Sequence, residues 1–117
     1  MAEHNELGKI GEELAQKYII NKGYRIRECN WRFGKNEIDI IAETNEYLVV
    51  VEVKTRSNLS FGYPEEAVDE DKVEKISETA EGWFEDKDID DPEWRIDIIG
   101  IEWHGKNPKI DHIQNIS

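Results

Sequence analysis

The order of apolar and polar positions along the chain predicts two helices and several short strands. Apolar residues recur at helical spacing over 4–22 and again over roughly 69–86. Asn5 and Asp69 are the expected N-terminal caps, and Gly23 is the expected stop of the first helix. Runs typical of strands cover 24–29, 37–42, 47–55 and 94–103, with a further short strand at 109–113. The resulting αβββαβ order favours an α/β fold with a mixed sheet flanked by helices.

Each expected helix carries an apolar stripe, and polar or turn-forming segments separate the elements. The stripe of the first helix is Leu7, Ile10, Leu14, Tyr18 and Ile19, and that of the second is Val73, Ile76, Ala80 and Trp83. The segments NWRFGKN (30–36), SNLSFGYP (57–64) and DKDIDDP (86–92) are predicted as connections. With no repeat or low-complexity linker, residues 1–117 are expected to form one domain.

Charged residues interrupt the two strongest strand predictions, where an unpaired buried charge costs several kcal/mol. If the hairpin loop has an even length, Ala42 faces Tyr47 and Asp39 faces Val50. Five charged residues then share one sheet face: Glu37, Asp39, Glu52, Lys54 and Arg56. Asp39 and Glu52 become diagonal neighbours, roughly 7–8 Å apart between backbones, and are placed to hold a divalent cation. An odd loop would put Asp39 on the opposite face.

The first helix offers one more carboxylate for this site. Gly8, Gly11 and Ala15 form a patch of small residues beside the apolar stripe, and Glu12 borders that patch. If the helix packs on the sheet through its glycines, Glu12 reaches the strand carboxylates. Its neighbour Glu13 points toward solvent.

The composition changes this picture mainly through its charge. The net charge of −12 argues against a nucleic-acid partner, but residues 64–93 alone hold 14 acidic residues against three lysines. The rest of the chain is nearly neutral. No apolar stretch approaches the roughly 20 residues that span a membrane, and Cys29 is the only cysteine. A cytoplasmic protein without disulfides is the simplest expectation.

An Asp on one strand and Glu-x-Lys on the next, with an upstream helical Glu, resembles the PD-(D/E)xK, or restriction-endonuclease-like, nuclease superfamily. Here these residues are Asp39, Glu52-Val53-Lys54 and Glu12. Almost the whole chain is similar to the small YraN-like bacterial family, which is related to archaeal Holliday-junction resolvases. The motifs are GKIGEELA (8–15), NWR (30–32), EIDIIA (37–42), VEVKTR (51–56), FG (61–62), Lys72, RID (95–97) and IDHIQN (110–115). Asn36 departs from the glycine usual in that family, and because Asn tolerates a left-handed backbone the turn is expected to survive.

The resemblance implies a metal-dependent hydrolysis of phosphodiester bonds, in DNA first of all. Asp39 and Glu52 would bind magnesium or manganese, helped by the Val53 carbonyl and by Glu12. Lys54 would orient or deprotonate the attacking water or stabilise the transition state. Phosphate contacts are expected from Arg32, Lys35, Arg56 and Lys72. Cutting a junction would need two sites and hence a homodimer.

Two other readings stay open beside the nuclease. In the first, the chain is a nucleic-acid binder that keeps the fold without cutting. In the second, it is a protein-interaction module that uses its acidic second helix.

Arg95 and Asp97 are interpreted as a structural ion pair. The three histidines show no ligand spacing, so surface or supporting roles are expected for His4, His104 and His112. The four tryptophans are interpreted as core and interface residues.

Overall fold

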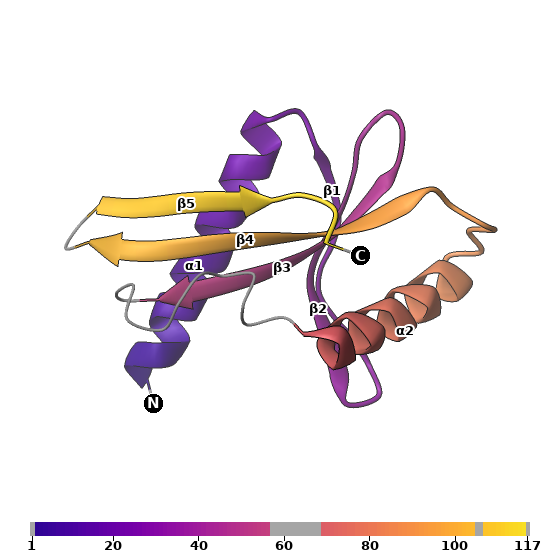
Figure 1. Ribbon diagram of the computed structural model, residues 1–117, viewed down its shortest axis with the longest axis horizontal. Helices are drawn as coiled ribbons and strands as arrows, with labels where there is room; N and C mark the ends of the chain where they lie inside the picture. Colours follow the sequence, from indigo (N-terminus) through magenta and orange to yellow (C-terminus); the bar gives the residue numbers. More distant parts are fainter. Residues whose placement is uncertain (1, 57–68, 105–106, 117) are drawn as a thin grey trace.

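The computed structural model describes residues 2–56, 69–104 and 107–116, with side chains omitted for 2–7 and 104. The elements are α1 (Ala2–Asn21), β1 (Arg25–Phe33), β2 (Asn36–Glu43), β3 (Leu48–Arg56), α2 (Glu70–Asp86), β4 (Trp94–His104) and β5 (Asn107–Ile113). One sheet has the order β1-β2-β3-β4-β5 (Figure 1). Among the described strands, β3 and β4 form the one parallel pair. The predicted α/β class with a mixed sheet is confirmed, and the arrangement is consistent with a restriction-endonuclease-like core.

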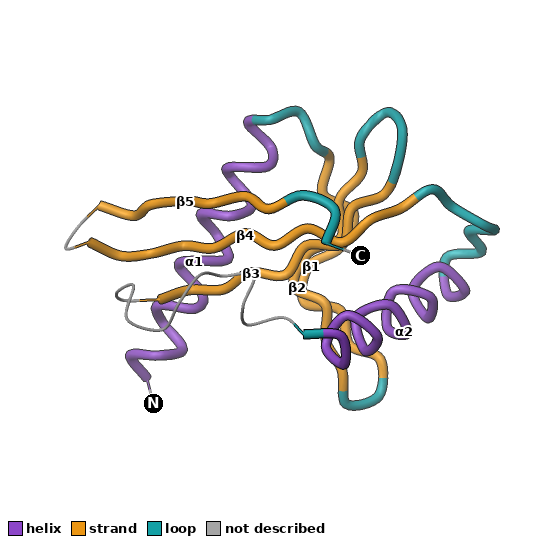
Figure 2. Tube along the Cα trace, in the orientation of Figure 1, coloured by secondary structure: helices purple, strands orange, loops and turns teal. Residues whose placement is uncertain are grey.

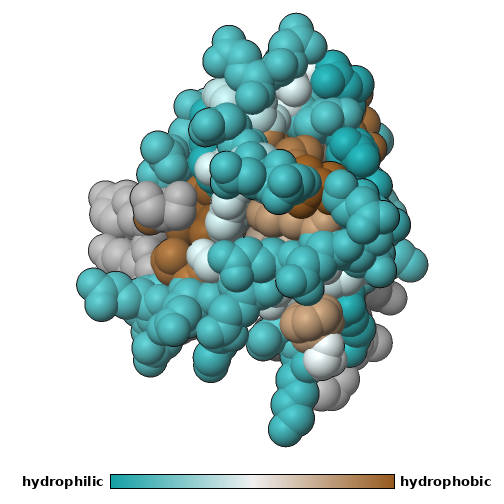
Figure 3. Space-filling view, turned by 90° about the vertical axis from the view of Figure 1, so that its right-hand side faces the viewer, coloured by the Kyte–Doolittle hydropathy of each residue, from teal (hydrophilic) through white to brown (hydrophobic). Residues whose placement is uncertain are grey.

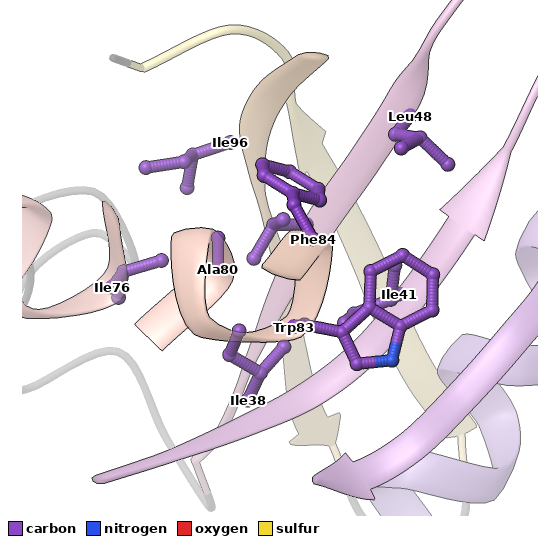
Figure 4. Close-up of a cluster of buried hydrophobic side chains, with 9 residues drawn as sticks. Ile38, Ile41, Leu48, Ile76, Ala80, Trp83, Phe84 and Ile96 are labelled. Atoms are coloured by element: carbon purple, nitrogen blue, oxygen red, sulfur yellow. The ribbon is translucent and has the colours of Figure 1, made fainter. Parts of the chain in front are cut away.

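The two helices cover opposite faces of the sheet, because successive residues of each strand point to opposite sides (Figure 2). On one face α2 packs Ile76, Ala80, Trp83 and Phe84 against strand residues that include Ile41 and Ile96 (Figure 4). On the other face α1 packs Ala15 and Ile19 against a second buried cluster. The strand members of that cluster are Ile40, Ala42, Val49, Val51, Ile99 and Ile101.

The helix predictions are right in position and differ in detail. Asp69 caps α2 as expected, since its Oδ1 accepts a hydrogen bond from the Lys72 N–H at 2.9 Å. The predicted cap Asn5 is wrong, because α1 begins at Ala2 and Asn5 lies inside the helix. Ile10 was expected in the buried stripe but is 43% exposed.

The face of α1 that meets the sheet is a line of small residues at i, i+4 spacing. Gly11 and Ala15 are buried there, with Ile19 one turn further. A side chain at Gly11 would collide with the Thr55 hydroxyl of β3, so glycine is what permits the close approach. Gly8 has no close neighbour and does not belong to this contact.

The predicted connection 30–36 is wrong, because β1 runs through Asn30–Trp31–Arg32 to Phe33. Only Gly34 and Lys35 form the turn, with Gly34 at a left-handed φ of 64°. Asn36 begins β2 and does not have a positive φ. The left-handed position expected at Asn36 therefore lies two residues earlier, because cross-strand pairing overrides the weak strand propensity of this segment.

The β2–β3 hairpin is shifted by two residues from the predicted register. Glu43 faces Leu48 and Ala42 faces Val49, so the connecting loop is 44–47. Thr44 fixes this loop, since its hydroxyl accepts hydrogen bonds from the N–H groups of Glu46 and Tyr47, both at 3.1 Å. A shift of two keeps Asp39 on the side of Glu52. The predicted single face of five charged residues is wrong for Glu37, because the alternation of β2 breaks at Asp39. Continued by one pair, the register sets Asp39 directly opposite Glu52 instead of diagonally.

One face of the molecule is mostly hydrophilic, and apolar side chains show mainly in a central hollow (Figure 3). None of the helices in the described ranges has the length and apolarity needed to cross a membrane. The predicted loop 57–64, with its FG motif, lies outside the described residues.

Candidate functional site

The candidate site lies where the alternation of side chains between the two sheet faces is broken. Ile38 and Ile40 are two residues apart, yet Ile38 packs under α2 and Ile40 under α1. The break falls at Asp39 and, across the β1–β2 pairing, at Asn30, which has a left-handed φ of 52°. Both strands turn over at this point, and the Asp39 carboxylate lies close to Glu12 of α1 as well as to Glu52 of β3.

The Asp39 side chain, and not the backbone of β2, accepts a hydrogen bond from the β3 backbone. The paired residues of β2 and β3 end at Ile40 and Val51. Beyond that point the Val53 N–H donates to Asp39 Oδ2 at 2.8 Å. The hydrogen bond fixes Asp39 at the end of the hairpin, where the two strands part.

Glu52 is a buried carboxyl group that contacts Asp39 directly. Its residue is 4% exposed, and its Oε2 has no hydrogen-bond partner within the protein. Burial, and then the negative charge and hydrogen bond of Asp39, raise the pKa of Glu52 to about 8, although Lys72 and Lys54 act against this. Glu52 therefore keeps a proton at neutral pH, and the protonated acid can donate to the Asp39 carboxylate.

Glu12 approaches the same carboxylate from α1, as the sequence predicted. Burial, followed by the charge of Asp39, raises the pKa of Glu12 above its ordinary value. The Asn30 amide, in the orientation that satisfies its neighbours, donates to Glu12 at 3.2 Å and to Glu37 at 3.0 Å. Glu13 is exposed. Asp39 is thus the centre of the cluster, with Glu52 on one side and Glu12 on the other.

The five cations chosen from the sequence fall into two groups. Lys54 and Lys72 lie beside the acid pair, and Lys72 Nζ is 3.8 Å from Glu52 Oε1. The other three lie near strand ends or in the β1–β2 turn: Arg32, Lys35 and Arg56. Arg32 pairs with Glu37 at 3.3 Å with a side chain that is 76% exposed, and Lys35 is exposed in the turn. Lys72, selected as a phosphate contact, thus has a carboxylate partner of its own.

Sequence reasoning missed the extent of a second polar cluster around Asp97. The predicted pair with Arg95 exists, with Arg95 Nε 2.9 Å from Asp97 Oδ1. His112, expected in a surface or supporting role, has a side chain only 3% exposed and lies with Nε2 2.7 Å from Asp97 Oδ2. Arg95 also donates to the hydroxyl groups of Tyr24 and Tyr47. Burial would raise the pKa of Asp97, but the bonds to His112 and to the Asn115 N–H, with the charge of Arg95, lower it.

The Asp97 cluster is a structural polar network that connects elements of the fold, and it is not part of the candidate site. It joins β4 to β5, since His112 Nε2 contacts Asp97, and to the C-terminal half of α1, since the His112 ring packs edge-on against Tyr18. The Asn115 N–H also donates to Asp97 Oδ1 at 2.9 Å. Lys22, which contacts His112, follows the end of α1, and nine helical residues, about 14 Å along the axis, separate it from Glu12. The only sequence signal was the spacing of Arg95 and Asp97 on one strand face. Nothing in the sequence paired them with His112.

The comparison with known proteins gives a consistent result over nearly the whole chain. The chain is 46% identical over 114 residues to a UPF0102 protein of Phocaeicola vulgatus, which covers 97% of this chain and 93% of the relative. It is 49% identical to one of Bacteroides thetaiotaomicron with the same coverage. A UPF0102 protein of Flavobacterium psychrophilum is 44% identical, with 98% of this chain and 96% of the relative covered. The model described as "Uncharacterised protein family UPF0102" matches residues 11–101, and the chain belongs to this family.

Proposed function

We propose that this protein is a magnesium-dependent endonuclease, or a structure-selective DNA-processing protein, that hydrolyses phosphodiester bonds. The observation that carries the proposal is the buried contact between Asp39 and Glu52, with Glu52 Oε2 left without a partner. A chain keeps such an arrangement at a cost in stability, because a buried acceptor without a partner costs about 1–3 kcal/mol. Perturbed acids with defined charged neighbours are typical of functional sites.

The donor set fits a hard divalent cation. Asp39 and Glu52 supply carboxylate oxygens at one point, and magnesium and manganese prefer oxygen ligands. Within the described ranges, no three His, Cys, Asp or Glu side chains form a group ready to hold a metal. A cation there would therefore rest on the two carboxylates, with the Val53 carbonyl, Glu12 and water completing its shell. Bound at this point, it would supply a nucleophile and offset charge on the phosphate.

The remaining groups have separate roles in the proposed reaction. Lys54, beside Glu52, is placed to orient or deprotonate the attacking water or to stabilise the charged transition state. Arg32, Lys35 and Arg56 would hold the backbone phosphates. Lys72 Nζ lies 3.8 Å from Glu52 Oε1 without a cation. It would turn to the substrate phosphate once Glu52 binds a cation.

The placement in the PD-(D/E)xK superfamily is part of the proposal. Its support is the αβββαβ order together with the meeting of Asp39, Glu52 and Lys54 at the end of one hairpin. A likeness to junction resolvases adds the expectation of a homodimer, because a junction presents two strands to be cut.

A protein-interaction module is the second candidate, and the charge of the chain favours it. The net charge is −12, and α2 exposes Glu74, Glu78, Glu81 and Glu85. Such a surface repels the phosphates of nucleic acid and suits a basic protein partner.

A binding and cleavage assay on branched DNA separates the candidates. We expect cutting with magnesium and none with chelator, and we expect Lys54→Ala to slow cutting about 100-fold, a factor typical of a lost acid–base group. Binding without cutting at any magnesium concentration would indicate a silent nucleic-acid binder. No binding at low salt would favour the protein-interaction module. Lys75→Ala, on an exposed lysine of α2, is the matched control.

Glu12→Gln should weaken manganese binding several-fold, whereas Glu13→Gln should leave it unchanged. The reason is that Glu12 meets Asp39 and its neighbour Glu13 is exposed, although both changes remove the same charge. Isothermal titration of manganese into both variants measures the difference. Equal effects would mean that Glu12 contributes only general negative charge.

A further inference from the structure

An aromatic pair stands at the tip of the β1–β2 hairpin, outside the acid cluster. Phe33 is 50% exposed, and it is one of three exposed large apolar residues in the described part of the chain. Its ring stacks on Trp31, with centroids 5.8 Å apart and planes 13° from parallel. Trp31 in turn packs against the buried cluster under α2. The exposed ring therefore rests on a support that reaches the core.

The second support of Phe33 is a glycine inside α2. Gly82 is buried, and a Cβ at this position would come within 2.9 Å of the Phe33 ring. Glycine inside a helix costs about 1 kcal/mol relative to alanine. The helix thus gives up stability at a position where a side chain would displace the ring. Phe33 is held in place and is not a loose surface residue.

The Trp31–Phe33 pair has acidic residues on one side and basic residues on the other. A pocket of about 310 Å³ is lined by Trp31, Phe33, Gly82, Glu85 and Asp86. Glu85 and Asp86 repel a phosphate from this pocket but not a neutral base. Arg32 lies between the two aromatic residues on the strand and so projects to the opposite face, while Lys35 is exposed in the turn. A nucleobase fits the side of Trp31 and Phe33, and the phosphates of the same strand fit the side of Arg32 and Lys35.

We propose that Phe33 stacks on an unpaired nucleobase next to the phosphate that is cut at the Asp39–Glu52 site, which makes it a specificity-determining residue. The inference rests on the proposed function. Phe33 faces Asn36 in the sheet, and Asp39 is three residues further along β2, about 10 Å at 3.3 Å per residue. That spacing suits a base that flanks the phosphate. A base in a continuous duplex is stacked on both sides, so the substrate class is a strand that is single or branched at this point.

The test is binding of a labelled 20-nucleotide single strand and of a hairpin duplex at low salt, with calcium and, in parallel, with chelator. Phe33→Ala should weaken single-strand binding about tenfold, within the range measured when stacking residues are truncated to alanine. Duplex binding should stay as in the wild type. Phe33→Trp should restore binding, and Phe33→Leu should not, because leucine is apolar without a stacking face. Ile20→Ala, which truncates a 53% exposed residue of α1, is the control for loss of apolar surface.

The outcomes separate this inference from the proposed function. If the wild type binds the single strand and Phe33→Ala binds it as well as Ile20→Ala does, the stacking role is overturned while nucleic-acid binding stands. If the wild type binds neither probe, the proposed function and the inference both fall. If Phe33→Ala instead turns a dimer into a monomer in sedimentation with unchanged binding per subunit, the ring is a self-association contact and the inference is overturned.

Discussion

Saturating manganese is expected to raise the melting temperature of this protein by about 10 °C. A cation that binds only the folded state, at a hundredfold excess over its dissociation constant, adds about 2.7 kcal/mol to the free energy of unfolding. For a domain of 117 residues this corresponds to a shift of about 10 °C. The binding energy comes from Asp39 and Glu52, which face each other without a sufficient positive partner.

Asp39→Asn should remove most of that rise. The amide keeps an oxygen to accept the Val53 N–H, so the hairpin end survives while the ligand charge is lost. Glu37→Gln is the matched control, because Glu37 lies two residues away on the same strand and pairs with Arg32. Melting curves with manganese and with chelator on the three proteins give the comparison. An unmoved wild-type curve would mean that the carboxylates are not a metal site, and the binding module would then be the better account.

In chelator, the free energy of unfolding should fall as the pH rises from about 4.5 to about 8. The Glu52 pKa is raised from 4.5 to about 8 by burial first and by Asp39 second. Between these values the folded protein holds a proton that the unfolded chain has released, so raising the pH favours unfolding. Below the lower value both states are protonated, and above the upper value the loss is complete. The total is on the order of a few kcal/mol.

Glu52→Gln should flatten this pH profile and give the more stable protein above pH 8. Glutamine keeps the shape and the donor of the protonated acid, and it carries no charge to be buried. Urea unfolding in chelator at pH 5.5, 7 and 9 measures the effect, with Glu13→Gln as the exposed control. A wild-type curve parallel to that of Glu52→Gln over this range would show that Glu52 is ionised when folded at neutral pH.

The same proton links pH to metal binding. Because a cation must displace the proton of Glu52, manganese affinity should increase as the pH approaches 8 and level off above it. Function and stability then meet at one residue: the charge that destabilises the metal-free protein is the charge that a cation would use.

Strand periodicity was sufficient to place the acid pair. Alternation along 47–55 separates Val49, Val51 and Val53 from Glu52 and Lys54, and any even loop sets Asp39 on the side of Glu52. The register error of two residues changed the neighbours from diagonal to opposite without changing the face. The pattern of small residues on α1 likewise chose Glu12 over Glu13, because helical geometry fixes which side chain borders the contact face.

The parts that could not be predicted depend on contacts distant in sequence or on single backbone angles. The left-handed φ of Asn30 coincides with the change of face in β1 and β2 at Asp39. The apolar periodicity of the sequence does not predict this angle. Lys72 meets Glu52 only because α2 returns across that face of the sheet. His112 meets Asp97 only through the β4–β5 register, which sets Ile99 opposite His112.

The most direct measurement is a crystal grown in chelator at pH 8.5 and then soaked in manganese, with anomalous data collected near the manganese edge. We expect one strong anomalous peak between the Asp39 and Glu52 carboxylates, and no peak there in Asp39→Asn crystals treated in the same way. Wild-type crystals without a peak at this point, and with the two side chains still in contact, would contradict a metal-dependent nuclease site.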